Sequence, residues 1–163
     1  KQALQAYLPN AEIRYVFLGA ELGARPDNHD CYVDGKALYD RIAATDAFQR
    51  GLQRLLKGSE EHRIALMCAE KDPLTCHRAI LICQHLLPFN LEIGHIHSNG
   101  ELEYHEELEE RMLKLHDLQD PEPVQQLSLF PETAPPLPER SQRIIQAYQQ
   151  QGDRNAYVEK DSD

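Results

Sequence analysis

A short segment in the middle of the chain holds several side chains that can do chemistry together. Cys68, Glu70, Cys76, His77 and Arg78 bring two thiols, a carboxylate, an imidazole and a guanidinium into one stretch. A thiolate is a nucleophile, an imidazole or carboxylate can move its proton, and a guanidinium binds anions. The segment therefore predicts a pocket for an anionic ligand, with Arg78 as a ligand-binding residue and Cys68, Glu70, Cys76 and His77 as catalytic residues.

The flanking residues predict a strand before this segment and a helix after it. The near-continuous apolar run before Cys68 is typical of a parallel strand buried on both faces, over 63–68. Asp72 and Pro73 are typical of an N-cap and a first helical residue, which predicts a helix over 73–87. The positive end of such a helix stabilises a thiolate at Cys76. Open α/β sheets bind ligands at the carboxyl ends of their strands, where Cys68 would lie.

Two other interpretations of the same residues stay open. Cys68, Cys76 and His77 would suit a metal ion, or the two thiols a disulfide, although their spacing matches no common zinc motif. Alternatively, the cysteines are only buried apolar side chains and Arg78 pairs with an acid. The residues by themselves name no cofactor.

Further candidates lie on either side of the central segment. Two glycines after a predicted strand would let a ligand approach the backbone, and an arginine beside them would contact an anion. Two histidines alternate along a predicted strand, at 95 and 97, and point to one face. The ligand-binding candidates are Gly19, Gly23, Arg25, His95 and His105.

Composition limits the class of protein. The chain has 163 residues, of which 41% are apolar, and a net charge of −10. No segment is apolar for long enough to span a membrane, and no signal peptide is visible, so we expect a cytoplasmic protein whose four cysteines are reduced. Cys31 and Cys83 fit structural positions. The acidic balance argues against non-specific binding of duplex nucleic acid by the surface itself.

The order of the predicted elements indicates an α/β domain. Strands over 13–18, 63–68 and 91–97 alternate with helices over 38–56, 73–87 and 104–118, and Ser98-Asn99-Gly100 predicts a turn. This order implies a mainly parallel, Rossmann-like sheet flanked by helices. The helix over 38–56 is expected to break near Thr45, with Asp46 capping its second part. Because the sheet is thin and the chain begins at Lys1, we expect residues 1–118 to be an N-terminally truncated domain.

The C-terminal part has a different character. Residues 119–140 are rich in proline and predict an irregular linker. Residues 141–163 predict a short helix, over 141–150, and a loose end from Val158 onwards.

Three motifs resemble one known family. Residues 68–78 resemble the Cys-Ala-Glu…Pro-x-x-Cys-His-Arg signature of the bacterial and archaeal "domain of unknown function 488", with Pro73 one place later. Residues 15–26 are similar to its Tyr-x-x-Leu-Gly-x-x-Leu-Gly-x-x-Pro loop, and residues 95–105 to its His-Ile…Gly…His element. The resemblance covers about 3–115 and lacks the family's N-terminal β-α-β piece. It implies a fold class and a set of site residues, but no reaction.

A peptide in the linker is similar to a different recognition motif. Gln126, Leu127, Ser128, Leu129 and Phe130 resemble the short peptide by which bacterial polymerases and repair proteins dock on the DNA sliding clamp. Leucine and phenylalanine are apolar anchors for a groove, and glutamine offers amide hydrogen bonds. Alternatively, these apolar residues pack back on the domain.

Together these features predict an enzyme-like protein with a nucleotide or nucleic-acid ligand, linked to DNA repair or replication through the clamp. A metal- or redox-binding module and a non-catalytic adaptor are the alternatives.

Overall fold

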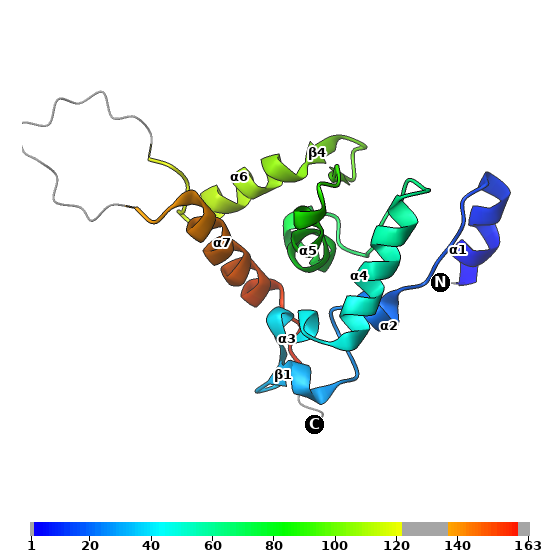
Figure 1. The fold of residues 1–163 in the computed structure, drawn as a ribbon, viewed down its shortest axis with the longest axis horizontal. Coiled ribbons are helices and arrows are strands. Elements are labelled where there is room, and N and C mark those ends of the chain that lie inside the picture. Colours follow the sequence, from blue (N-terminus) through cyan, green and yellow to red (C-terminus); the bar gives the residue numbers. More distant parts are fainter. Residues whose placement is uncertain (1, 122–136, 160–163) are drawn as a thin grey trace, which may run out of the picture.

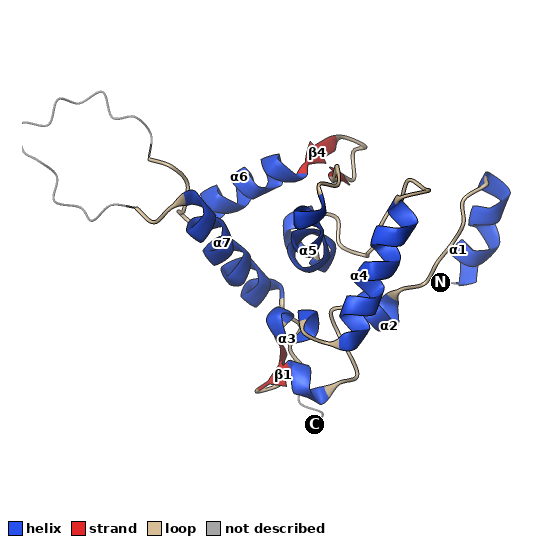
Figure 2. Ribbon diagram, viewed as in Figure 1, coloured by secondary structure: helices blue, strands red, loops and turns tan. Residues whose placement is uncertain are grey.

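The computed structural model describes residues 2–121 and 137–159, and these are mostly helical (Figure 2). No helix among them is both long and apolar enough to cross a membrane. In chain order the elements are α1 (Gln2–Tyr7), η1 (Leu8–Ala11), α2 (Gly19–Leu22), η2 (His29–Cys31), β1 (Tyr32–Val33), β2 (Lys36–Ala37), α3 (Tyr39–Ala43), α4 (Asp46–Ser59), η3 (Pro73–Thr75), η4 (Arg78–Cys83), α5 (Gln84–Leu86), η5 (Leu87–Phe89), β3 (Gly94–Ile96), β4 (Leu102–Tyr104), α6 (His105–Leu115) and α7 (Arg140–Asn155).

The helical segment formed by η4 and α5 lies at the centre of the fold, with α4 on one side and α6 and α7 on the other (Figure 1). Residues 79–83 are all buried. Leu81 and Ile82 belong to the apolar cluster that includes α3 and α4, whereas Ala79 and Ile80 belong to a second cluster with α6 and α7. Each large apolar side chain buried this way contributes about 1.5–3 kcal/mol. The central helix therefore joins the two halves of the core.

The predicted break between two helices near Thr45 is confirmed, but the capping residue is different. Thr45 is the N-cap of α4, and its hydroxyl accepts a hydrogen bond from the Phe48 amide at 3.1 Å. Asp46, the expected cap, is the first residue of the helix, where its charge favours the helix dipole instead. The cap places Phe48, which is fully buried, in the core.

The sheets are small and antiparallel. β1 pairs with β2, and β3 pairs with β4 in the register Gly94↔Tyr104 and Ile96↔Leu102. The turn expected at 98–100 connects β3 to β4, so the third predicted strand forms a hairpin with residues 102–104. No large parallel sheet is present among the described residues.

The other two predicted strands are not paired. Residues 13–18 and 63–68 lie outside every helix and strand of the described chain. The expectation that 63–68 is buried on both faces is wrong, because Ile64 is 44% and Met67 is 62% exposed. Burial of a strand depends on neighbours, and without a paired strand in the described chain these apolar side chains face water.

The predicted helix over 73–87 is divided into several short pieces. Asp72 caps η3 by accepting a hydrogen bond from the Leu74 amide at 3.0 Å, and Pro73 is the first residue of that turn, as predicted. Cys76 is extended, with φ −112° and ψ 130°, and separates η3 from the rest. Residues 78–83 then form a π-helix, a rare element that is frequent at functional sites.

The C-terminal helix is part of the core. α7 is longer than the expected helix over 141–150, and its Ala147 and Tyr148 are buried against α6. The expectation of a loose chain from Val158 is wrong for the first residues. Val158 bridges to Lys36, and the Glu159 amide donates to the Gly35 carbonyl at 2.8 Å. The clamp-type peptide at 126–130 lies outside the described residues.

Arg143 connects α7 to the chain on both sides of residues 122–136. Its side chain is 4% exposed. It donates hydrogen bonds to the Leu118 carbonyl at 2.6 Å and the Pro138 carbonyl at 3.0 Å, and to the Asp120 carboxylate. The two flanking segments are therefore held at one point.

Candidate thiol and imidazole site

The closest pair of reactive groups is formed by Cys68 and His77. Cys68 ends the unpaired segment 63–68, His77 follows the extended residue 76, and the Cys68 Sγ lies 3.6 Å from the His77 Nδ1. Burial lowers the pKa of His77, and the charges of Arg78 and Arg25 lower it further, whereas Glu70 opposes them. The imidazole is therefore neutral at pH 7 and can accept the thiol proton.

Cys76 is the less accessible of the two thiols. It is fully buried, and the Arg78 Nε donates to its Sγ at 3.0 Å. Burial raises the pKa of Cys76, although the hydrogen bond and charge of Arg78 oppose this. Cys76 is extended and lies just before η4, and the backbone amide of Arg78, the first residue of η4, also lowers its pKa, but burial outweighs this helix N-terminal stabilisation. Cys68, which is half-buried, is the thiol that a ligand can reach.

Arg78 holds the loop that carries Cys68. Besides Cys76, it donates to the Leu66 carbonyl at 3.0 Å and to the Glu70 carbonyl at 3.2 Å. Each terminal nitrogen of a guanidinium carries two N–H groups, so one on each remains for an anion. The Glu70 side chain itself is exposed at the edge of the site.

Tyr39, at the start of α3, lies near this site although no sequence motif indicates it. Burial raises the pKa of Tyr39 to about 12, and the nearby Cys76, Cys68 and Glu70 raise it as well. The hydroxyl therefore stays protonated and can donate a hydrogen bond. Only tertiary packing brings α3 to the central helix, which is why a lone tyrosine in the sequence gave no signal.

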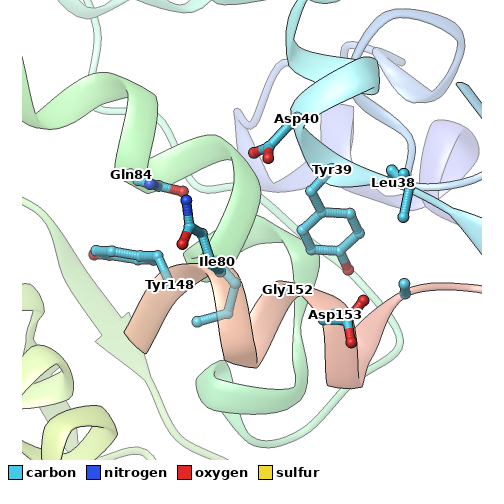
Figure 3. Close-up of a pocket in the computed structure, with 10 residues that line it drawn as sticks. Leu38, Tyr39, Asp40, Ile80, Gln84, Tyr148, Gly152 and Asp153 are labelled. Atoms are coloured by element: carbon cyan, nitrogen blue, oxygen red, sulfur yellow. The ribbon is translucent and has the colours of Figure 1, made fainter. Parts of the chain in front are cut away.

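Tyr39 also lines a cavity of about 290 Å³. Figure 3 shows Tyr39 and Tyr148 on opposite sides of it, with Asp40 and Asp153 on the Tyr39 side. Apart from Tyr39, none of the residues gathered around the thiols lines this cavity. Its two carboxylates disfavour an anionic ligand, so this cavity is not the predicted anion pocket.

The two glycines of the 15–26 motif have a steric role. A Cβ at Gly23 would lie 2.4 Å from the carbonyl oxygen of Gly19, so only glycine permits this approach of the backbone. The turn leads to Arg25, whose guanidinium lies 4.2 Å from the centre of the Tyr157 ring. Arg25 is exposed, and its positive charge is close enough to lower the pKa of His77.

Replacing Gly23 by alanine is expected to lower the free energy of unfolding by about 2 kcal/mol, because backbone atoms must shift to admit the methyl group. Gly58→Ala is the matched control, since its Cβ would lie 3.1 Å from a flexible methyl group of Ile64. That variant should change stability by less than about 1 kcal/mol. Urea unfolding of both variants measures the difference, and equal stabilities would contradict the steric role.

An ion-pair network supports the segment before Cys76. Arg111 of α6 donates to the Glu103 carboxylate at 2.8 and 2.9 Å and to the Asp72 carboxylate at 2.9 and 3.2 Å. The hydrogen bond from Arg111 lowers the pKa of Asp72. At Glu103 burial raises the pKa, but hydrogen bonds from Arg111 and His97 still hold it below its usual value. No sequence motif indicated this arginine.

This network predicts a pH dependence of stability. Because the pKa values of Asp72 and Glu103 are lowered on folding, their contribution is present above their unfolded pKa values and is lost as the pH falls through the lower folded values. Arg111→Gln is expected to lower the free energy of unfolding by about 1 kcal/mol at pH 7 and by less at pH 3.5. Urea unfolding at both pH values measures this, and a constant difference between variant and parent would contradict it.

His95 and His105, predicted to bind the ligand, lie in a second cluster. The His95 Nε2 lies 2.8 Å from the His105 Nδ1, and both side chains are buried together with Cys83. His97, expected to share a role with His95, pairs instead with Glu103 at 2.9 Å. The structure thus brings Cys68, Cys76, His77 and Arg78 together, with Glu70 and Arg25 nearby. His95 and His105 are not part of this group and form their own cluster with Cys83.

Comparison with known proteins gives one result. A search of curated proteins and a search of solved structures each returned no match. The family model described as "Domain of unknown function DUF488" matches residues 1–84, which include the whole thiol segment but end before His95. Because this match covers 84 of 163 residues, the chain belongs to the DUF488 family.

Proposed function

We propose that the chain is an enzyme-like protein that uses Cys68 and His77 on an anionic ligand of the nucleotide or nucleic-acid class. The observation that supports this best is the 3.6 Å distance between the Cys68 Sγ and the Nδ1 of a neutral imidazole. Arg25 and Arg78 add positive charge beside that pair, which favours a phosphate or carboxylate group.

In this proposal His77 accepts the proton of Cys68. The thiolate forms a bond to an electrophilic atom of the ligand, and the group that leaves takes its electron pair and the proton from His77. Arg78 and Arg25 hold the anionic group. The protonated Tyr39 hydroxyl donates a hydrogen bond at the edge of the site.

Alkylation with one neutral and one anionic reagent tests this proposal. For each state of the chain, the rate of Cys68 alkylation by iodoacetate is divided by the rate with iodoacetamide. This ratio should be about tenfold higher in the folded chain than in the unfolded chain. His77→Gln should slow both reagents, whereas Arg25→Gln should slow only iodoacetate. Cys68→Ser is the control, because the other three cysteines are buried and should react only on unfolding. The same reagent ratio in the folded and unfolded chains would contradict an anion-binding thiol site.

A metal site is the second candidate function for these residues. The ligand atoms of Cys68, Cys76 and His77 lie within 4.8 Å of one another, which suits a zinc-type ion. Zn²⁺ should then protect Cys68 from iodoacetamide, and the protection should disappear in Cys76→Ser. Equal alkylation rates with and without Zn²⁺ would exclude this alternative.

The clamp-type peptide belongs to the same proposal. Its support is the sequence Gln-Leu-Ser-Leu-Phe at 126–130, which would bring an acidic protein to DNA. A pull-down with a bacterial sliding clamp should retain the parent chain but not the Leu129→Ala, Phe130→Ala double variant. Equal retention would contradict docking through this peptide. Docking by a chain whose Cys68 has no special reactivity would favour the adaptor alternative.

The finer fold and the location are also proposals. We infer that 13–18 and 63–68 are strands of a mainly parallel, Rossmann-like sheet, and the support is their β-branched and apolar composition. Slow amide exchange in these segments would indicate pairing, and fast exchange would contradict it. A cytoplasmic location agrees with four free cysteines.

A further inference from the structure

The second cluster has the residue types and the spacing of a metal site. Cys83 comes from the end of η4, His95 from β3 and His105 from the first position of α6. One ligand atom from each lies within 4.8 Å of the other two, and all three side chains are buried. The backbone fixes this arrangement, because the His105 amide donates to the Ile93 carbonyl at 3.0 Å and ties α6 to the hairpin.

Hydrogen bonds from outside the cluster determine which nitrogen of His105 carries the proton. The Tyr148 hydroxyl donates its proton to the Glu109 carboxylate at 2.9 Å, so its oxygen accepts from the His105 Nε2 at 2.7 Å. The His105 Nδ1 is then left with a lone pair that points to His95, 2.8 Å away. A metal-binding histidine characteristically donates its other N–H to such a partner.

The donor atoms of this cluster suit a zinc-type ion. Tyr148, the hydrogen-bond partner of His105, belongs to the buried apolar cluster of η4, α6 and α7. One thiolate and two imidazoles form the donor set that zinc-type divalent ions prefer over magnesium or calcium.

We propose that Cys83, His95 and His105 form a second, buried binding site for one Zn²⁺ ion, separate from the Cys68 site. On binding, Cys83 releases its proton to solvent and its sulfur bonds to the metal. His105 binds through Nδ1. His95 binds through Nε2 after its proton moves to Nδ1, so one proton is released for each ion bound. This site does not depend on the proposed function of Cys68.

Cobalt titration tests the site, because Co²⁺ replaces Zn²⁺ and a cobalt–thiolate bond absorbs in the near ultraviolet. The Cys68→Ser, Cys76→Ser double variant removes the first cluster and should still bind one Co²⁺ with this absorption. Adding Cys83→Ser should abolish the absorption. Adding Cys31→Ser instead, at another buried cysteine, should leave it unchanged. Circular dichroism of each variant shows whether it is folded.

A variant of the otherwise unchanged chain gives an independent measurement. Tyr148→Phe removes the hydroxyl that orients His105 and should weaken Co²⁺ binding at this site by about tenfold, without touching the first cluster. Release of one proton per ion, followed with a pH indicator, should accompany binding. The proposal is overturned if the folded double variant binds no Co²⁺, if the absorption survives Cys83→Ser, or if Tyr148→Phe binds as the parent does.

Discussion

Arg143→Met is expected to lower the free energy of unfolding by about 3 kcal/mol. The guanidinium is buried, and its loss leaves the carbonyl oxygens of Leu118 and Pro138 and the Asp120 carboxylate without their donor. Methionine fills a similar volume, so the loss comes from hydrogen bonds rather than from a cavity. Since α7 carries Tyr148, the variant should also loosen the packing of this tyrosine against α6.

The matched control for Arg143→Met is Arg140→Met, on the same helix. Arg140 pairs with Glu110, and the two side chains are 42% and 50% exposed. An exposed pair contributes little, so this variant should stay within about 0.5 kcal/mol of the parent. Urea unfolding followed by circular dichroism compares the two. Similar losses from both variants would show that the buried arginine has no special role.

Arg78→Met is expected to have the second large effect, at the thiol site itself. It removes three hydrogen bonds, to the Cys76 sulfur and to the carbonyl oxygens of Leu66 and Glu70, and should cost about 3 kcal/mol of stability. The loop between these carbonyls carries Cys68. When this loop is released, Cys68 and His77 no longer stay in contact. The rate of Cys68 alkylation should therefore no longer depend on His77.

Arg54→Met provides the corresponding control, because Arg54 pairs with Glu21 while 53% of its side chain is exposed. Alkylation of Cys68 in this variant should be unchanged. Two comparisons decide the role of Arg78. Urea unfolding measures the loss of stability. The rate of Cys68 alkylation in Arg78→Met, divided by the rate in the Arg78→Met, His77→Gln double variant, reports the geometry of the site. An Arg78→Met chain with the parent's alkylation ratio would show that the loop holds its shape without the arginine.

Local patterns in the sequence predicted local structure well. The Asp72 cap, the Pro73 start, the helix break at Thr45 and the turn at 98–100 all depend on neighbouring residues, and all are confirmed. The family resemblance is confirmed as well, over residues 1–84. These features need no information about residues far away in the chain.

Features that depend on distant residues were not predicted. The apolar run 63–68 was expected to be buried, but burial requires a neighbouring strand that its own residues cannot supply. Cys76 was placed on a helix, whereas the turn after Asp72 ends there and leaves it extended. Tyr39, Arg111 and Arg143 carry no motif. Only tertiary structure places Tyr39 near the thiols and gives the two arginines their hydrogen-bond partners.

The π-helix at 78–83 has a consequence for how this chain tolerates insertions and deletions. An α-helix advances by about 100° per residue, so deleting one residue between Arg78 and Cys83 would turn everything after it by roughly that angle. Cys76 would stay with Cys68, while Cys83 would leave the two histidines. Such a deletion would convert the π-turn into ordinary helix. The extra residue of the π-helix therefore sets the relative phase of the Cys68 cluster and the Cys83 cluster along the chain.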